Sequence, residues 1–541
     1  MMFALDQLIL LPILLPLTLG ALLVLLRGHE QLKFVVSLGG TLCLLTAALA
    51  LYLLTDREVW PNGVGVYLAG NWMAPFGISL VVDRLAALML LLSTVIASAA
   101  LIFSRRRWSR AGVHFHSLFQ FLLTGINGSF LTGDLFNLFV FFEIMLAASY
   151  GLLLLGLQPR RVRASMQYVV INLIASSIFL IGIALIYAAC GTLNLADLSQ
   201  RATSLDDTQR LLLETGAAIL AIAFLTKGAM WPLGFWLPAT YAAAAPPVAA
   251  MLVLMTKVGI YVILRLWLLI FAGQEDHWHT LSGMALVAGG LLTLCFGTLG
   301  LLSNLEPGRM AGFSAIVSSG TLLIAIGYGG PAVVSAALFY LVSSTLAVAA
   351  FMLLLELIER IRDPGAELLA QTMEAFDIDD AADESAGVAI PAATAFLGLS
   401  FVTCALIIAG LPPLSGFVAK FSLLHALLNP ASASLAVSTL TFVIIALVIF
   451  SGLAAIIALL RFGVRVFWSI PGMKPPRLHL SEALPASGLL LLCILLSLGA
   501  GPASDYLART SAALHQPGQY SERVLSSTPV PGAGIPDGEI P

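Results

Sequence analysis

Long runs of apolar residues, separated by short polar gaps, constrain this chain more than any other feature. The hydrocarbon core of a bilayer is about 30 Å thick, so a helix crosses it in about 20 residues. About fourteen runs have the length to do so, near residues 5–26, 33–54, 79–103, 112–131, 134–156, 164–190, 211–245, 247–273, 278–302, 308–329, 332–358, 393–428, 432–460 and 484–500. We therefore expect an all-α polytopic membrane protein with about 14 transmembrane helices.

Composition excludes several other classes of protein. Only 10% of the 541 residues are charged, against about 25% in an ordinary soluble domain. There is no basic domain, so a nucleic-acid binder is excluded. The five cysteines show no C-x-x-C spacing, and the chain has neither a G-K-[ST] nor a G-x-G-x-x-G motif. These absences argue against iron–sulfur clusters, ATP drive and bound dinucleotide, so no cofactor is expected and the chain is not expected to be an enzyme.

The basic residues are unevenly divided between the two sets of loops. If the spans alternate, one side carries Arg27, Lys33, Arg105, Arg106, Arg107, Arg110, Arg160, Arg161, Arg163, Arg309, Arg360, Arg362, Arg461, Arg465, Lys474 and Arg477. The other side carries only Arg57, Arg201, Arg210, Arg509 and Arg523. Because positively charged loops stay in the cytoplasm, the asymmetry predicts a multi-pass protein of the bacterial inner membrane with both termini periplasmic.

Two of the runs, 211–245 and 393–428, are too long for one straight helix and are interrupted by proline. The interruptions read alike, Trp231–Phe235 in the first and Pro413–Phe417 in the second. Each falls in the fourth span of a five-span block, if the blocks are spans four to eight and nine to thirteen. Matching broken spans in two repeats indicate an ion-translocation site, whereas two unrelated proline kinks are the alternative.

This pattern divides the chain into consecutive segments. We expect an N-terminal three-helix segment (1–111), a first five-helix repeat (112–273), a second repeat (278–460), a last loop and helix (461–500) and a polar tail (501–541). An insert at 359–391 holds eight carboxylates, Asp363, Glu367, Glu374, Asp377, Asp379, Asp380, Asp383 and Glu384. We expect the insert and the tail to be solvated, partly disordered segments; partner docking or attraction of cations is the alternative for the insert.

Four charged residues lie deep inside apolar runs. Lys257 is ten residues after Pro247 and Glu143 nine after Asp134, which at 1.5 Å per residue places both about 14–15 Å into the bilayer. Lys227 and Lys420 lie at a similar depth. A charge at the bilayer centre costs about 2.5–3.5 kcal/mol or more, so these residues need partners or water, and intramembrane charges of this kind mark ion pathways.

Glu143 and Lys227 can compensate each other. At about 5–6 Å and an effective dielectric near 20, their attraction is about 3 kcal/mol. Burial favours the neutral forms of both side chains, whereas pairing favours their charged forms. If the two side chains moved apart, one of them would therefore take up or release a proton. A static ion pair that fixes helix packing is the alternative. Lys257 and Lys420 have no acidic neighbour in sequence, which suits relay sites that exchange protons through water.

His425, five residues after Lys420, is a candidate for extending the proton path toward one face. A satisfied polar group near a helix end is the alternative reading. Glu143, with carbonyls freed at the helix breaks, is also a candidate ligand for a monovalent cation, although no full ligand set can be read.

These residues stand in motifs that resemble the D subunit of Mrp-type (Mnh, Pha) monovalent cation/proton antiporters. The motifs are Thr132–Glu143, Lys227 with Trp236–Pro238, Thr256–Tyr261 and Gly410–Phe421. The wider family includes the proton-pumping membrane subunits of respiratory complex I. Gly234 and Tyr241 stand where many complex I relatives carry histidine, which favours the antiporter branch.

The resemblance implies fourteen helices, two inverted five-helix repeats, broken helices 7 and 12, and a hydrated axis in mid-membrane. It also implies that Glu143 and Lys227 are the ion pair, Lys257 the central relay lysine and Lys420 the terminal lysine. The expected partners are other membrane subunits of a hetero-oligomer, with H⁺ and Na⁺ or K⁺ as transported ions. A pump module of a quinone-, ferredoxin- or hydrogenase-linked oxidoreductase and an inert assembly scaffold remain alternatives.

Overall fold

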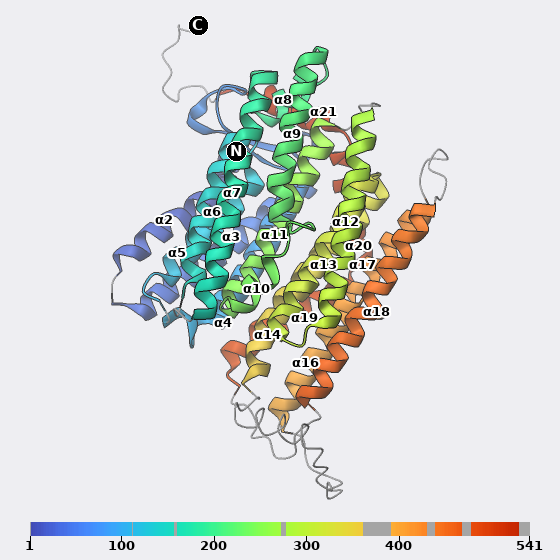
Figure 1. Cartoon of the computed structure of the whole chain (residues 1–541). Coiled ribbons are helices and arrows are strands. Elements are labelled where there is room, and N and C mark those ends of the chain that lie inside the picture. The colour runs from blue at the N-terminus through green and yellow to red at the C-terminus, as the bar shows by residue number, and fades with distance from the viewer. Residues whose placement is uncertain are drawn as a thin grey trace, which may run out of the picture.

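Helices make up nearly all of the folded chain (Figure 1). The computed structural model describes residues 2–26, 28–110, 112–155, 159–271, 277–360, 391–429, 439–467 and 478–529. Its helices are α1 (Met2–Leu8), α2 (Leu11–Leu25), α3 (Glu30–Asp56), α4 (Arg84–Ser104), α5 (Phe115–Leu131), α6 (Leu135–Leu153), α7 (Pro159–Cys190), α8 (Leu195–Arg201), α9 (Asp207–Lys227), α10 (Leu237–Ala243), α11 (Pro246–Ile270), α12 (His277–Ser303), α13 (Pro307–Tyr328), α14 (Pro331–Glu359), α16 (Ala392–Ala409), α17 (Ser415–Leu428), α18 (Thr439–Phe467), α19 (Leu480–Leu498), α20 (Ala500–Leu514) and α21 (Pro517–Leu525).

The expected class of fold, an all-α polytopic membrane protein, is confirmed. Within the described residues, 12 helices are long and apolar enough to cross a membrane, and α2 and α17 are shorter apolar helices. α11 lies at the centre of the bundle, because every residue in its most apolar stretch is buried by other helices. The acidic residues of the insert fall in 361–390, outside the described residues. The division into repeats stays a prediction.

Both proline-interrupted runs are broken helices. α9 ends at Lys227 and α10 begins ten residues later, with a proline in its first turn. α16 ends at Ala409, where Gly410 adopts the left-handed conformation (φ 81°) that a helix C-terminus often requires of glycine. Two prolines follow before α17 begins at Ser415. The breaks leave backbone carbonyls without helical partners in mid-bundle.

One segment expected to be a span from residue 79 begins instead as a strand. β1 (Gly65–Leu68) and β2 (Ser79–Val82) form an antiparallel hairpin, and α4 begins only at Arg84, capped by the Asp83 carboxylate. Apolar residues in this hairpin are buried against the helix ends, so hydropathy alone could not separate strand from span. α1 lies at the same end of the bundle as this hairpin, because Trp60 Nε1 donates a hydrogen bond to Asp6 of α1 at 2.8 Å.

The expectation of a solvated tail is wrong for residues 501–525. They form α20 and α21, amphipathic helices that fold back onto the hairpin end of the bundle. Tyr506 donates to the Arg84 carbonyl at 2.8 Å, Ser511 donates to the Pro331 carbonyl at 2.7 Å, and Val524 is buried. The first and last described helices therefore lie at the same end of the bundle, as an even number of crossings requires.

The opposite end, which we call the basic end, is tied together by arginines around a buried carboxylate. Glu356, near the end of α14, accepts from Arg107 at 3.1 Å, Arg360 at 2.8 Å and Trp108 Nε1 at 2.7 Å. Arg360 also pairs with the buried Glu482 at the start of α19. The end of α4 is thereby fixed to α14 and α19.

At the hairpin end, Arg265 of α11 holds the Asp83 carboxylate in a bidentate pair, with contacts of 2.6 and 2.8 Å. Burial alone would raise the pKa of Asp83, but the charge and hydrogen bonds of Arg265 hold it below its usual value. The pair therefore contributes stability at neutral pH, and this contribution is lost as the pH falls through the lowered pKa.

Replacing Arg265 with Gln is expected to lower the stability of the protein by about 3–5 kcal/mol, because it leaves a buried carboxylate unpaired. Arg509→Gln is the matched control, since its pair with Asp56 is more exposed and is worth about 0–1 kcal/mol. Thermal unfolding of the two variants in detergent measures the difference. Equal melting temperatures would contradict the role given to Arg265.

Candidate functional site

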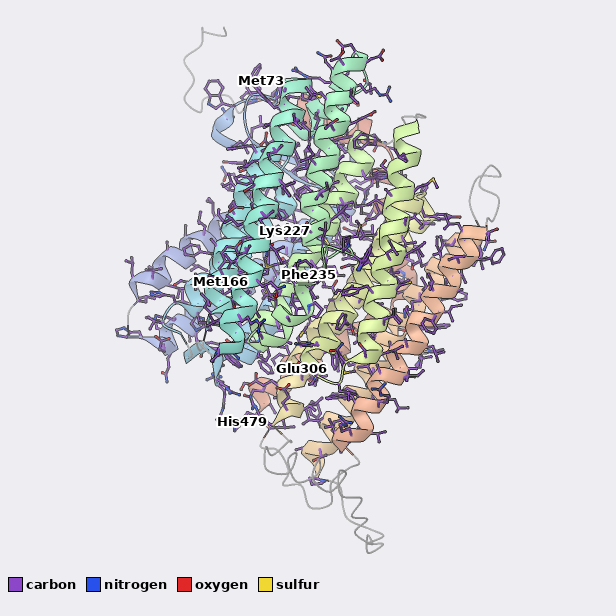
Figure 2. All side chains as sticks on the ribbon, in the orientation of Figure 1. Met73, Met166, Lys227, Phe235, Glu306 and His479 are labelled. Carbon is purple, nitrogen blue, oxygen red and sulfur yellow. The ribbon has the colours of Figure 1, made fainter. Side chains whose placement is uncertain are left out.

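Lys227 is the last residue of α9, and its ammonium group is fully enclosed by neighbouring helices. Its Nζ donates to Asn172 Oδ1 of α7 at 2.6 Å, and Asn172 in turn donates to the Tyr168 carbonyl. The C-terminal end of a helix carries partial negative charge, which favours a cation there. Figure 2 shows Lys227 about midway along the bundle. This position agrees with the depth expected from the sequence.

Glu143 lies on α6 and acts on Lys227 through charge–charge attraction rather than by direct contact. No salt bridge within 4.0 Å joins the two among the described residues, so the pair acts over a longer distance. One carboxylate oxygen, Oε1, is buried without a hydrogen-bond partner. The rings of Phe142, Phe179 and Phe224 pack together beside this site. This oxygen is therefore free to accept a hydrogen bond from a group that the protein itself does not supply.

Lys257 lies in the centre of α11, is 1% exposed and donates to Ser318 Oγ of α13 at 2.7 Å. Ser318 is hydrogen-bonded to Ser344 of α14 at 2.8 Å. A cavity of about 20 Å³ lies against both serines and reaches Ile408 at the end of α16. That volume holds about one water molecule.

Lys420 of α17 reaches back to the break that precedes its helix. Its Nζ donates to the carbonyl of Ala409 at 2.9 Å and is 3.5 Å from the carbonyl of Ile408. These are carbonyls that the end of α16 leaves free, and they lie at the negative end of that helix. A side chain at Gly452 would fill this space, because a Cβ there would come within 3.2 Å of Lys420 Nζ.

Polar groups and small cavities lie next to the three lysines, and we call this set, together with the lysines, the relay file. A small cavity of about 10 Å³ is lined by Lys227, Asn172 and Thr256, the last of which precedes Lys257 in α11. From Lys257, Ser318 and Ser344 lead to the second cavity, which touches the carbonyl-bearing Ile408 beside Lys420. The two small cavities give water molecules room to complete the row.

His425 does not belong to the relay file in this structure. Lys420 is buried on one face of α17, whereas the His425 side chain is exposed and lies against Phe421. Its backbone carbonyl accepts from Asn429. Within the described part of the chain, no three or more His, Cys, Asp or Glu side chains gather as a metal site. The cation site expected near Glu143 stays a prediction.

Sequence reasoning missed the neutral members of the relay file. Asn172, Ser318 and Ser344 are the direct or next partners of the lysines. Each is a polar residue inside an otherwise apolar run, which is the only sequence signal they give. The signal is weak because Ser and Thr hydroxyls in membrane helices often donate to their own helix backbone, as Thr321 does to Val317.

Comparison with known proteins identifies the family of this chain. Residues 132–451 match the family described as "NADH:quinone oxidoreductase/Mrp antiporter, TM". The chain is 52% identical over 529 residues to the D subunit of a probable K(+)/H(+) antiporter of Rhizobium meliloti (strain 1021), covering 97% of this chain and 98% of that protein. It is 34% identical to the D subunit of a Na(+)/H(+) antiporter of Alkalihalophilus pseudofirmus, covering 96% and 99% of the two chains.

Solved structures show the same fold. A chain in the structure of the Mrp complex from Dietzia sp. DQ12-45-1b superposes with a TM-score of 0.81 and 26% identity, covering 96% of this chain and 100% of that one. A chain of the archaeal membrane-bound sulfane sulfur reductase gives a TM-score of 0.78 and 25% identity, covering 96% and 99%. The chain belongs to the NADH:quinone oxidoreductase/Mrp antiporter membrane-subunit family. Within that family, the relatives that it resembles over nearly its full length are named as D subunits of antiporters.

Proposed function

We propose that this chain is the proton-translocating D-type subunit of a multisubunit monovalent cation/proton antiporter. The observation that carries the proposal is the relay file, in which three buried lysines lie next to hydroxyl groups, free carbonyls and small cavities. Charges at this depth are costly, and in membrane proteins they mark ion paths. The names of the full-length relatives, which are D subunits of K⁺/H⁺ and Na⁺/H⁺ antiporters, support the same function.

In the proposed mechanism, the charge on Glu143 controls the proton on Lys227. While Glu143 is ionised, its attraction stabilises the Lys227 ammonium group. When Glu143 takes up a proton, this attraction is lost and Lys227 gives up a proton toward Lys257. Asn172 accepts from Lys227 in one state, and its amide can turn to let water approach. The transfer then continues through Ser318 and Ser344 toward Lys420.

The cation is proposed to enter where Glu143 leaves Oε1 without a protein partner. A monovalent cation there would replace the proton on the same carboxylate, so that one ion leaves as the other arrives. Inward movement of protons would thus drive cation export. The name of the R. meliloti relative favours K⁺ as the substrate, whereas the more distant relatives favour Na⁺.

The chain is proposed to work in the bacterial cytoplasmic membrane as part of a hetero-oligomer with other membrane subunits. The match to a chain of the Mrp complex supports these partners. We propose that the basic end, with Arg107 and Arg360, faces the cytoplasm, because positively charged loops stay on that side of a membrane. The hairpin end and both termini then face the periplasm.

The test is cation-driven proton exchange by the whole complex. Co-expressed subunits are placed in vesicles from an antiporter-deficient host, a proton gradient is imposed, and dequenching of a pH-sensitive dye is followed after addition of K⁺, Na⁺ or Li⁺. We expect dequenching with K⁺ or Na⁺. Dequenching with none of the three cations would contradict the proposal and favour the alternative, a proton-pumping module of a redox complex.

A further inference from the structure

A second set of buried polar side chains runs along α5, away from the relay file. His116, Gln120, Thr124 and Asn127 are each no more than 1% exposed. Their spacing of four, four and three residues places them on one face of the helix. Figure 1 shows α2, α3 and α5 at one side of the bundle and α16 to α18 at the other. We call this row, with its partners described below, the α5 column.

Neighbouring helices supply partners in the middle of the α5 column. Gln120 donates to Ser37 Oγ at 2.9 Å and to Thr41 Oγ1 at 3.1 Å, both on α3. Asn127 accepts from Ser93 Oγ of α4 at 2.8 Å and donates to the carbonyl of Pro12 at 3.0 Å.

That carbonyl is free because Pro16, four residues later in α2, has no N–H to donate to it. The column is therefore built from four helices rather than from one.

At the basic end the α5 column begins at Glu30, Lys33 and His116. Lys33 is 2% exposed and donates to Glu30 Oε1 at 2.9 Å and to the Val113 carbonyl at 3.0 Å. Glu30 itself is partly exposed, so it connects the site to the solvent. His116 lies one helical turn before Gln120, with its ring against Phe34 and Phe115.

Polar atoms without a hydrogen-bond partner are concentrated at the basic end of the α5 column. Ten buried side-chain nitrogen or oxygen atoms lack a partner in the described residues, and four of them are here: Glu30 Oε2, both ring nitrogens of His116, and Gln120 Oε1. A buried polar atom without a hydrogen bond costs free energy, so four in one cluster indicate an occupant. Three acceptor groups beside one ammonium group suit a proton carried by water.

At the hairpin end the column meets a second polar group. The carbonyl of Phe130, three residues after Asn127, accepts from Tyr261 at 2.7 Å. Tyr261 accepts from Arg265 at 2.9 Å, and Arg265 pairs with Asp83. A cavity of about 30 Å³ is lined by Asp83, Arg265 and Tyr520, with α20 and α21 forming its other wall. That volume holds at least one water molecule.

We propose that the α5 column is a second proton route across the membrane, with His116 and Glu30 as its proton-binding site at the basic end. Water completes the row between the hydroxyl and amide groups, and the Asp83–Arg265 pair closes the hairpin end. The inference rests on the proposed antiport function: each exchange cycle is proposed to move protons along both routes, so interrupting either one slows the exchange.

Few charges act on His116. Glu30 and Lys33 of α3 are the charged groups whose fields reach it among the described residues. Arg105, just after the end of α4, also lies over the face of the Phe34 ring, 5.5 Å from its centroid. Burial disfavours a proton on His116 most, Glu30 favours it and Lys33 opposes it, so the ring takes up a proton only as the basic side becomes acidic.

The test uses the whole complex in vesicles and measures the exchange rate while the pH on the basic side is varied. His116→Gln removes the titrating ring but keeps a polar side chain, so we expect the dependence on that pH to flatten. Gln120→Leu and Thr41→Val interrupt the row, so we expect the rate to fall about tenfold. Thr46→Val is the matched control, because Thr46 is exposed on the same helix as Thr41 and donates only to its own helix.

Co-purification of the other subunits shows whether each variant assembles, and a variant that does not assemble is replaced by the next of the three. Wild-type rates and an unchanged pH profile in the assembled column variants would overturn the inference and leave the column as packing. If the Glu143→Gln complex also exchanges at the wild-type rate, the proposed antiport function is contradicted. If only the column variants exchange at the wild-type rate, the inference about the α5 column alone is contradicted.

Discussion

Lys257→Met is expected to abolish cation-driven exchange, with at least a hundredfold loss of rate, while the complex stays assembled and at least as stable. Removing a proton-transfer group typically costs about 10²–10⁴ in rate. Methionine has a similar length and no charge, and replacing a buried charge by a well-packed apolar side chain is often neutral or stabilising. Ser318 keeps Ser344 as a hydrogen-bond partner after the change.

Exchange rate and melting temperature of the purified complex are the two measurements. A residue that merely held α11 and α13 together would lose stability when replaced, whereas a relay residue loses transport alone. Arg309→Met is the control, because that arginine lies at the bundle end with half of its side chain exposed. Normal exchange by Lys257→Met would show that the relay file does not pass through Lys257.

Glu143→Gln is expected to reduce exchange by about a hundredfold as well, because the neutral amide can neither take up a proton nor attract Lys227. Its Oε1 has no hydrogen-bond partner in the protein, so the change removes no contact and assembly should persist. Dye dequenching on addition of K⁺ or Na⁺ reports the rate.

Glu306→Gln serves as the comparison, since Glu306 lies near one end of the bundle (Figure 2) and is half exposed. If the assembled Glu143→Gln complex still exchanged ions at the wild-type rate, the buried charges would have no role in transport. The chain would then be an inert assembly scaffold.

The lysines of the relay file could be predicted because a charge in an apolar run is conspicuous. Only five lysines exist in the chain, and three of them lie inside such runs. The broken helices were predictable for the same kind of reason, since proline and glycine interrupt runs that are too long for one crossing. Both signals lie within a short stretch of sequence. Both stand out because a charge or an unpaired backbone group inside the bilayer costs a large amount of free energy.

The partners of those lysines could not be predicted, because they come from distant parts of the sequence. Asn172 lies 55 residues before Lys227, and Ser318 lies 61 residues after Lys257. Their selection depends on how α7 packs on α9 and how α13 packs on α11. The bond from Lys227 to Asn172 could not be predicted for the same reason: depth in the bilayer does not fix the rotation of a helix.

Helical geometry bears on two of the expectations, one for His425 and one for the tail. At about 100° per residue, His425 lies about 140° around the helix from Lys420 and so faces away from the relay file. In the tail, Tyr506, Thr510 and Leu514 recur every four residues, which is the pattern of a helix with one buried face. Its proline, glycine and serine content concealed that pattern.

The most direct test of the relay file is proton release by the solubilised complex when a cation is added without any gradient. A pH-sensitive dye in weak buffer measures protons set free by a pulse of K⁺ or Na⁺. If Glu143, Lys227, Lys257 and Lys420 form one connected file, the wild-type complex releases protons and the Lys257→Met and Lys420→Met complexes release far fewer. Equal release by all three complexes would contradict a connected file.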